Sequence, residues 1–318
     1  MLFRSAVLAA DLGATHARLE LSDLGGEALG ERIGEVPIAQ PPEVVLKWVE
    51  DQCSSMLAEA GISAERLRAI AVGIPGPVEF SSGRPVTPPI MPGWDGYAIP
   101  ERLQRRFPVP VLVDNDVNLM AIGEHALSFA DSPQLLFVKV ATGIGCGIIL
   151  NGDIYRGADG AAGDIGHIRL LGHEDVICEC GNTACLEAVA GGRAIARALV
   201  EADPGLAASV HNARDVVRLV SEYEPRAVRS VRHAGRQIGD VLAGVVNALN
   251  PGVIVIGGDL ANAQEPLIAG IRETIYQRST ALATRGLQVS GSTLGERAGV
   301  VGATKLAIDH VITTGLLV

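Results

Sequence analysis

Aromatic residues are scarce in this sequence of 318 residues: Phe, Trp and Tyr together make up 3% of it. Aliphatic side chains must therefore fill the core, since apolar residues still make up 48% of the chain. A core of Ala, Val, Ile and Leu is typical of parallel or mixed sheets that are covered by helices. No apolar run approaches the roughly 20 residues of a membrane helix. The composition favours an α/β protein that binds no membrane.

Basic residues are also few. The chain has 26 Lys and Arg against 36 Asp and Glu, which gives a formal net charge of −10. A negative field of this kind argues against binding DNA or an anionic membrane through general electrostatics. No run of Lys or Arg builds a local basic patch. We therefore expect that this chain alone binds no nucleic acid.

Cysteines are too few and too clustered for a disulfide framework. Three of the five lie between residues 178 and 185, which favours a metal site in a reducing compartment. The apolar segment that precedes Asp11 is shorter than the roughly 7–15 residues of a signal-peptide core. We therefore expect a cytoplasmic protein.

The length of the chain and an internal repeat predict two lobes, since one domain usually has about 150 residues. Residues 6–36 have the pattern strand, glycine turn, strand, turn, strand, and residues 134–157 repeat it. The pattern predicts a duplicated α/β fold with a ligand in the cleft between the lobes. We place the first lobe at 1–117 and the second at 118–299, and expect a helix over about 300–318 to pack back on the first.

Helices and strands alternate after each copy of the repeat. Apolar residues at helical spacing predict a helix, with an apolar face made of Val44, Val45, Trp48, Val49, Cys53, Met56 and Leu57. Apolar runs predict strands over 69–78 and 253–260. One face of a long helix that ends before Pro251 is marked by Ile238, Val241, Leu242, Val245, Val246 and Leu249.

Two glycine-rich turns occupy equivalent places in the repeat. The first contains Asp11, Gly13 and Thr15, and the second contains Thr142, Gly143 and Gly145. Such hairpins expose backbone N–H groups that bind phosphate oxygens, and an aspartate beside them suits a magnesium ion held through water. Either turn alone is better explained as an ordinary hairpin. The repeat favours ATP, and Gly257 and Gly258 suit the close approach of its adenosine part.

A polar tip follows the strand that leads to Asp114. Just past it, Asp116 would point into the cleft and accept the proton of a substrate hydroxyl that attacks the γ-phosphorus. Asn115 and Asn118 would fix either substrate hydroxyls or the start of the next helix. The alternative is that Asp116 simply caps that helix, and the spacing leaves both interpretations open.

Three cysteines and a histidine form a candidate metal site. The cysteines are Cys178, Cys180 and Cys185. Zinc takes four such ligands in a closed tetrahedron when its role is structural. His167 and His173 are rival fourth ligands, and spacing does not choose between them. Cys53 and Cys146 are predicted to be small core residues.

These segments together resemble the ROK family, which groups sugar kinases with sugar-responsive repressors. The matching segments are DLGAT, GIPGPV, NDVN, ATGIGCG, GAAGDIGHI, CECGNTACLE and NPGVIVIGGDL. The resemblance implies two lobes of the actin- and hexokinase-like (ribonuclease H-like) ATPase fold, often assembled as a homodimer. It implies ATP-dependent phosphorylation of a hexose hydroxyl, such as the 6-hydroxyl of glucose, with Mg²⁺ and with Asp116 as the base.

The resemblance also implies ligands. It selects His167 as the fourth zinc ligand, with one ring nitrogen on Zn²⁺ and the other on the sugar. The residues that it places around the sugar are Asn115, Asp116, Asp164, His167 and Glu187.

Four positions depart from the kinase pattern. Ala14 replaces a glycine, His16 a common lysine, Asp164 a glutamate, and Ile90 an asparagine that helps to hold the sugar. Asp164 and Ile90 bear on the affinity for the sugar and on its identity, and Ala14 and His16 bear on ATP turnover. The segments PPIMPGWDGY and AAGDIGHI resemble the regulators of the family, so the alternative function is a sugar-sensing domain of a ROK repressor with little or no catalysis. Such repressors carry a winged-helix domain before the ROK portion. Only five residues precede the first predicted strand, so we expect no such domain here.

Overall fold

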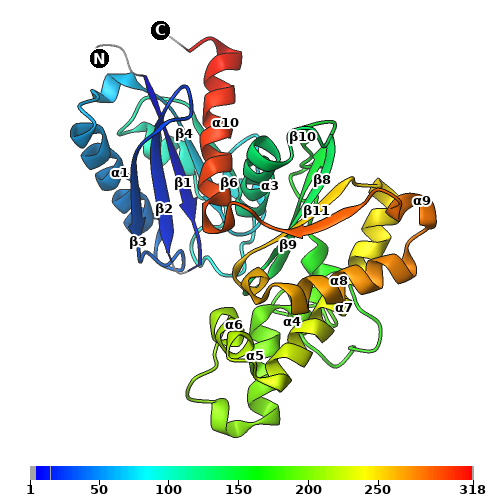
Figure 1. Cartoon of the computed structure of the whole chain (residues 1–318). Coiled ribbons are helices and arrows are strands. Elements are labelled where there is room, and N and C mark those ends of the chain that lie inside the picture. The colour runs from blue at the N-terminus through cyan, green and yellow to red at the C-terminus, as the bar shows by residue number, and fades with distance from the viewer. Residues whose placement is uncertain (1–4, 15, 317–318) are drawn as a thin grey trace. The chain divides into compact units, whose positions relative to one another are not determined.

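The chain divides into two compact units, each described here by itself (Figure 1). A computed structural model describes residues 5–14 and 16–316, so Thr15 of the first glycine turn lies outside the described residues. Unit 1 comprises residues 1–129, 156–162 and 296–318, and unit 2 comprises residues 130–155 and 163–295.

Unit 1 contains a five-stranded sheet with the order β3-β2-β1-β4-β7. The strands are β1 (Ala6–Leu12), β2 (Ala17–Asp23), β3 (Ala28–Gly34), β4 (Leu67–Ile74) and β7 (Val111–Asn115). The first three form the expected antiparallel meander, and β4 and β7 run parallel to β1. The predicted strand over 69–78 is wrong at its end. It stops at Ile74 because Pro75 and Pro77 have no N–H for the ladder.

Alternate residues of β1 enter two different cores. Leu8 and Ala10 pack in a cluster with helix α1, whereas Val7 and Ala9 pack in a cluster with helices α3 and α10. The helices of this unit are α1 (Pro42–Glu59), α2 (Ile99–Gln104), α3 (Asp116–Ser128) and α10 (Ala298–Thr314), with a short turn η1 (Ala64–Arg66) and a small hairpin of β5 (Val78–Glu79) and β6 (Arg84–Pro85).

The predicted apolar face of α1 is confirmed except at its start. Val44 is 50% exposed although Val45 beside it is fully buried, because Val44 lies off the helix face that Val45, Val49 and Cys53 form. Trp48 is partly buried and packs against Gly34 of β3, where a Cβ would lie 2.3 Å from the ring.

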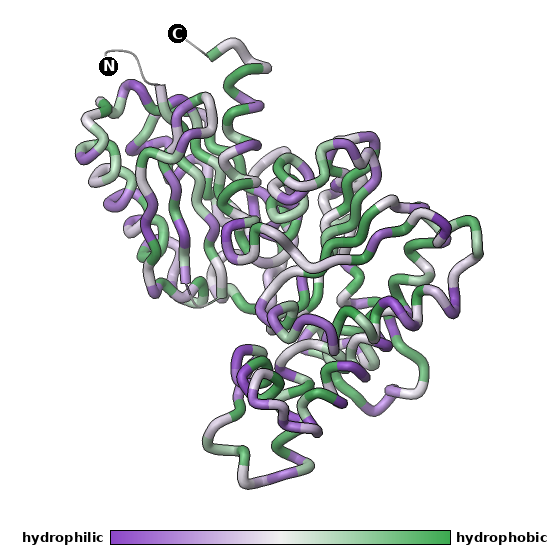
Figure 2. Tube along the Cα trace, in the orientation of Figure 1, coloured by the Kyte–Doolittle hydropathy of each residue, from purple (hydrophilic) through white to green (hydrophobic). Residues whose placement is uncertain are grey.

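Unit 2 repeats the strand order of unit 1, which confirms the predicted duplication. Its sheet has the order β10-β9-β8-β11-β12. The strands are β8 (Gln134–Val140), β9 (Ile144–Leu150), β10 (Asp153–Ile154), β11 (Val253–Gly257) and β12 (Gln288–Gly291). The interior strand β11 is apolar (Figure 2), and it is buried along its whole length. It ends at Gly257 and not at residue 260 as predicted, because Gly258 turns the chain with a φ of 84°.

The helices of unit 2 lie mainly after Cys185. They are α4 (Leu186–Ala190), α5 (Gly192–Ala202), α6 (Ala213–Ser221), α7 (Pro225–Leu249), α8 (Glu265–Arg278) and α9 (Ala281–Thr284), with short turns η2 (Ile165–His167), η3 (Pro204–Leu206) and η4 (Asp259–Ala263). A further turn, η5 (Gly295–Arg297), begins at the last residue of unit 2. The predicted long helix is α7, and it ends before Pro251 as expected, with Asn250 in the left-handed conformation.

No helix in the described part of the chain combines the length and the apolar character that crossing a bilayer requires.

Candidate active site and metal centre

Asp116 is the first residue of α3, directly after β7. Asn115 is the N-cap of this helix: its Oδ1 accepts hydrogen bonds from the N–H groups of Val117 (2.9 Å) and Asn118 (3.4 Å). Asn115 therefore fills the capping role that the sequence also allowed for Asp116. Asp116 is 2% exposed, so bulk water has little access to its carboxylate.

Asp11 of β1 lies near Asp116 in the same unit. Gly73 of β4 stands between them: a Cβ there would lie 3.5 Å from Oδ1 of Asp11 and 3.7 Å from Cα of Asp116. The first turn of α10 also approaches Asp11, since a Cβ at Gly299 would lie 2.2 Å from its Oδ2. A carboxylate beside a helix N-terminus is stabilised by the helix dipole. The structure thus brings the predicted magnesium partner and the predicted base to one edge of a sheet.

The first glycine turn is closed by its own backbone. The N–H of Gly13 donates to the carbonyl oxygen of His16 at 2.9 Å. This N–H therefore shapes the hairpin here and is not offered to a phosphate, contrary to the expectation that the turn exposes it. Any phosphate contact in this conformation would come from other groups of the turn.

The second glycine turn contacts Glu187. Oε2 of Glu187 accepts a hydrogen bond of 3.0 Å from the N–H of Ile144, and a Cβ at Gly143 would lie 2.1 Å from the same oxygen. Burial raises the pKa of the Glu187 carboxyl, and the hydrogen bond from Ile144 opposes that rise. The sequence assigned Glu187 to the sugar alone. Nothing in the local sequence except the glycine at position 143 indicated that Glu187 contacts the turn.

Gly257 and Gly258 allow β11 to approach β8 closely. A Cβ at Gly257 would lie 2.3 Å from the ring of Phe137, and one at Gly258 would lie 2.6 Å from the carbonyl oxygen of Val140. Both glycines lie at the carboxyl end of the parallel strands of unit 2. Open α/β sheets bind ligands at such edges.

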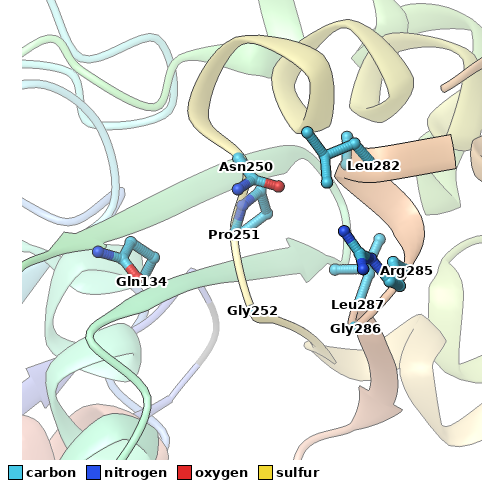
Figure 3. A pocket seen from close by; sticks show the side chains of 9 residues that line it. Gln134, Asn250, Pro251, Gly252, Leu282, Arg285, Gly286 and Leu287 are labelled. Carbon is cyan, nitrogen blue, oxygen red and sulfur yellow. The ribbon is translucent and has the colours of Figure 1, made fainter. Parts of the chain in front are cut away.

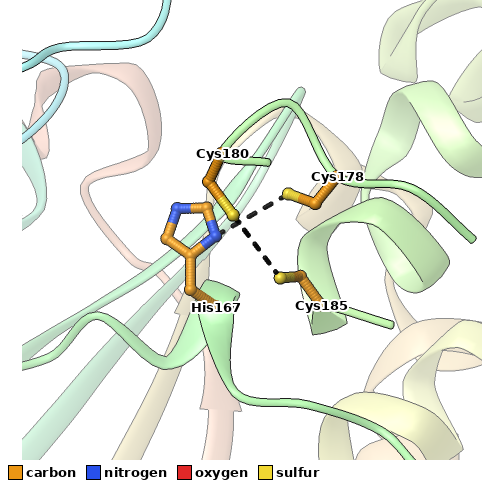
Figure 4. A group of neighbouring side chains, drawn as sticks. All are labelled: His167, Cys178, Cys180 and Cys185. Atoms are coloured by element: carbon orange, nitrogen blue, oxygen red, sulfur yellow. Dashed lines mark hydrogen bonds between the residues drawn. The ribbon is translucent and has the colours of Figure 1, made fainter. Parts of the chain in front are cut away.

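Four side chains from two segments form a metal-ligand group (Figure 4). One donor atom from each of His167, Cys178, Cys180 and Cys185 lies within 4.8 Å of the others. Nδ1 of His167 is 3.8 Å from Sγ of Cys178, and the Sγ atoms of Cys180 and Cys185 are 3.7 Å apart. A tetrahedral site with Zn–S bonds of about 2.3 Å places its ligands about 3.8 Å apart. The donor set therefore fits zinc.

The structure separates the two rival histidines. Nε2 of His173 lies 3.1 Å from Nε2 of Gln237, away from the thiols, so His173 is not part of the four-residue group. In His167, Nδ1 faces Cys178 while Nε2 lies 3.9 Å from Oδ1 of Asp164. One ring nitrogen thus faces the thiols and the other faces an acidic side chain that is 51% exposed.

The other two cysteines are core residues, as predicted. Cys53 and Cys146 are at most 4% exposed. Burial raises the pKa of each thiol to about 12, which keeps both neutral at physiological pH.

An open hollow of about 380 Å³ lies elsewhere in unit 2 (Figure 3). It is at the amino ends of β8, β11 and β12, opposite to the edge where ligands bind in such sheets. Its lining residues are Gln134, Asn250, Pro251, Gly252, Leu282, Ala283, Arg285, Gly286 and Leu287. None of the described site residues predicted from the sequence is among them.

Sequence reasoning missed two charged residues near Asp116. Asp114 is 2% exposed at the end of β7, and Arg156 forms an ion pair with it at 2.7 Å. The available signal was an aspartate directly after the apolar run of residues 111–113. Its partner Arg156 lies 42 residues away, and no local pattern in the sequence indicated it.

Comparison with known proteins adds a family. The sequence profile described as "ROK family" matches residues 7–310. A glucokinase of Halalkalibacterium halodurans is 30% identical over 92% of this chain and 92% of its own length. Among solved structures, a ROK hexokinase from Thermus thermophilus matches with a TM-score of 0.78 and 31% identity, over 97% of this chain and 99% of its own. A ROK family transcriptional regulator, a homologue of the E. coli MLC protein, matches with a TM-score of 0.84 and 27% identity, over 98% of this chain and 79% of its own.

Proposed function

The chain belongs to the ROK family, and on this basis we propose that it is an ATP-dependent kinase for a hexose hydroxyl, with Asp116 as the general base. One observation carries the proposal. Asp116 and Asp11 lie on either side of Gly73, and the side chain that caps α3 is that of Asn115. Phosphoryl transfer needs one carboxylate that accepts the proton of the nucleophile and another that helps to hold magnesium.

The proposed reaction transfers the γ-phosphoryl group of ATP to a sugar hydroxyl, the 6-hydroxyl in a glucokinase-like reaction. The hydroxyl oxygen forms a bond to the γ-phosphorus while the bond from that phosphorus to the bridging oxygen of ADP breaks. Asp116 accepts the proton of the hydroxyl. Asp11 would hold the magnesium ion, which would neutralise the phosphate charge of ATP. The low exposure of Asp116 supports this role, since excluding water limits wasteful hydrolysis.

The proposed nucleotide ligands are the glycine turns of both units and the Gly257–Gly258 step. The proposed sugar ligands are Asn115 and Asp116 in unit 1 and Asp164, His167 and Glu187 in unit 2. The exposed carboxylate of Asp164 beside Nε2 of His167 supports this role, since both offer polar atoms to a hydroxyl.

Structural zinc would hold the segment that carries His167 without acting on the phosphoryl group. With Nδ1 of His167 on the metal, Nε2 would keep its orientation toward the sugar. We further propose, on the resemblance to the family alone, that the chain works as a cytoplasmic homodimer.

A second candidate function is a sugar sensor with little or no catalysis. The regulator matches this chain with a higher TM-score than the hexokinase does, 0.84 against 0.78. Asp164 also supports it, because its side chain is one methylene shorter than the glutamate of the kinases and reaches less far toward a sugar.

A coupled ADP-release assay separates the two functions. The purified chain is given ATP, magnesium and one of glucose, mannose, fructose, N-acetylglucosamine or N-acetylmannosamine. Turnover of one sugar at about 1 s⁻¹ or more, an ordinary rate for an enzyme, supports the kinase. Absence of turnover with every sugar, while calorimetry shows that one binds, supports the sensor. Asp116→Asn protein purified in parallel reveals any contaminating kinase.

A further inference from the structure

Asp114 is a buried carboxylate in an apolar strand, two residues before the proposed base. It is 2% exposed. Its Oδ1 accepts hydrogen bonds from the N–H of Asn115 and from Nδ2 of Asn118, both at 2.8 Å. One oxygen of Asp114 therefore binds Asn115, directly before Asp116, and Asn118, two residues after it.

Arg156 holds the other oxygen. Its Nε and Nη2 lie 2.8 and 2.7 Å from Oδ2 of Asp114. The guanidinium stacks on Phe80, with its central carbon 3.6 Å from the ring centroid. Arg156 begins the segment of residues 156–162, which belongs to unit 1 although the chain on either side of it belongs to unit 2. This arginine is thus brought to β7 from a distant part of the sequence.

These contacts are specific to arginine. A buried carboxylate is costly unless charge and hydrogen bonds compensate it. Arg156 supplies both, and its flat guanidinium also covers the aromatic ring, which a lysine ammonium would not do in the same geometry. Arg156 therefore fixes the position of the Asp114 carboxylate in addition to neutralising its charge.

We propose that Arg156 is a positioning residue for Asp116. This inference rests on the proposed function. Arg156 fixes the position of Asp114, and Asp114 in turn fixes the positions of Asn115 and Asn118 around the base. Asn115 completes the arrangement, since its Oδ1 accepts from the N–H groups of Val117 and Asn118. Displacement of a reacting group by about 1 Å lowers a rate by about 10²-fold, so a loosened turn would slow catalysis.

The first test is kinetic and uses three variants. Arg156→Gln removes the charge, the Nε hydrogen bond and the guanidinium plane, and Arg156→Lys keeps the charge only. Arg84→Gln is the matched control, because Arg84 pairs with Glu101 at 2.8 Å in the same unit but is 42% exposed. We expect kcat to fall about 10²-fold in Arg156→Gln and about 10-fold in Arg156→Lys, with KM for sugar and ATP changed less than about 3-fold. Arg84→Gln keeps wild-type kcat.

The second test does not need turnover. Hydrogen exchange followed by NMR reports the protection of the backbone amides of Val117 and Asn118. We expect Arg156→Gln to reduce their protection about 10-fold or more, and Arg84→Gln to leave it unchanged. If Arg156→Gln does not fold, Arg156→Lys decides by the same two readouts.

The outcomes separate this inference from the proposed function. A folded Arg156 variant with wild-type kcat and wild-type protection overturns the inference and leaves the kinase standing. A fall in kcat that is matched by an equal rise in KM also overturns it, because positioning of the base acts on the chemical step. A wild-type protein that phosphorylates no sugar, together with lost protection in the Arg156 variants, overturns the kinase and supports the fixing of this turn.

Discussion

The backbone N–H of Ile144 donates a hydrogen bond of 3.0 Å to Oε2 of Glu187. Ile144 begins β9 after the second glycine turn, and Glu187 lies in the first turn of α4. A residue proposed to bind sugar therefore also holds a turn proposed to bind phosphate, within one unit. Gly143 makes this possible, since any side chain there would collide with the carboxylate.

Removing the Glu187 carboxylate is predicted to weaken nucleotide binding as well as sugar binding. In Glu187→Ala the N–H of Ile144 loses its acceptor and the turn loosens, so the nucleotide Kd measured without sugar should rise about 10-fold, the effect of one hydrogen bond to a charged group. Asp164→Asn is the control, because it alters a proposed sugar ligand outside this contact. Calorimetry with a non-hydrolysable ATP analogue measures the nucleotide Kd of both variants. Equal nucleotide affinity in the two variants would disprove the link.

Asp116→Asn is predicted to slow catalysis without weakening sugar binding. An amide cannot accept the proton of the hydroxyl, so kcat should fall about 10²–10⁴-fold while the sugar Kd stays within about 3-fold. Asp95→Asn, at an exposed aspartate of the same unit, should keep wild-type kcat. Steady-state kinetics and calorimetry check the two effects. A wild-type kcat in Asp116→Asn would contradict the proposed mechanism.

Capping and catalysis should separate between neighbouring residues. Asn115→Ala removes the side chain that accepts from Val117 and Asn118, so the free energy of unfolding should fall by about 1 kcal/mol. Asp116→Asn keeps the cap, so its free energy of unfolding should fall by clearly less. Urea denaturation of both variants measures the difference. A larger loss in Asp116→Asn would mean that Asp116 supports the helix start after all.

Metal analysis is predicted to find about one zinc per chain. Cys180→Ser removes one of four donors, so zinc content should fall and the melting temperature should drop, because structural zinc contributes directly to folding. Cys53→Ala is the control for loss of a thiol outside the group, and it should keep its zinc. Unchanged zinc content and stability in Cys180→Ser would argue against the site.

Stability should decline at alkaline pH through Cys53 and Cys146. Burial raises the pKa of each to about 12 in the folded state, above the value of about 8.5 for an unfolded thiol. Below about pH 8.5 both states are neutral. Above it the unfolded state ionises first, so each thiol removes about 1.4 kcal/mol per pH unit up to about pH 12. Denaturation at pH 8 and 10 should show a shallower decline in Cys53→Ala/Cys146→Ala, and an identical slope would contradict the assignment.

Local patterns in the sequence determined the duplicated fold. Strand and turn signals repeat in residues 6–36 and 134–157, and both copies became the first three strands of equivalent sheets. The three cysteines were also readable, because they lie in one short segment. Signals of this kind can be recognised without knowledge of the fold. Alternation of apolar and polar residues, helical spacing and short ligand spacings depend only on neighbours along the chain.

Tertiary structure alone decided which distant groups meet. It put His167 with the thiols and His173 with Gln237, although both stand at plausible spacings. It also brought Arg156 to Asp114 and Glu187 to Ile144. Each of these contacts joins residues more than ten positions apart, and it exists because sheets and helices pack in one particular way. No periodicity in the sequence records such packing, so the partners of these side chains became known only from the folded chain.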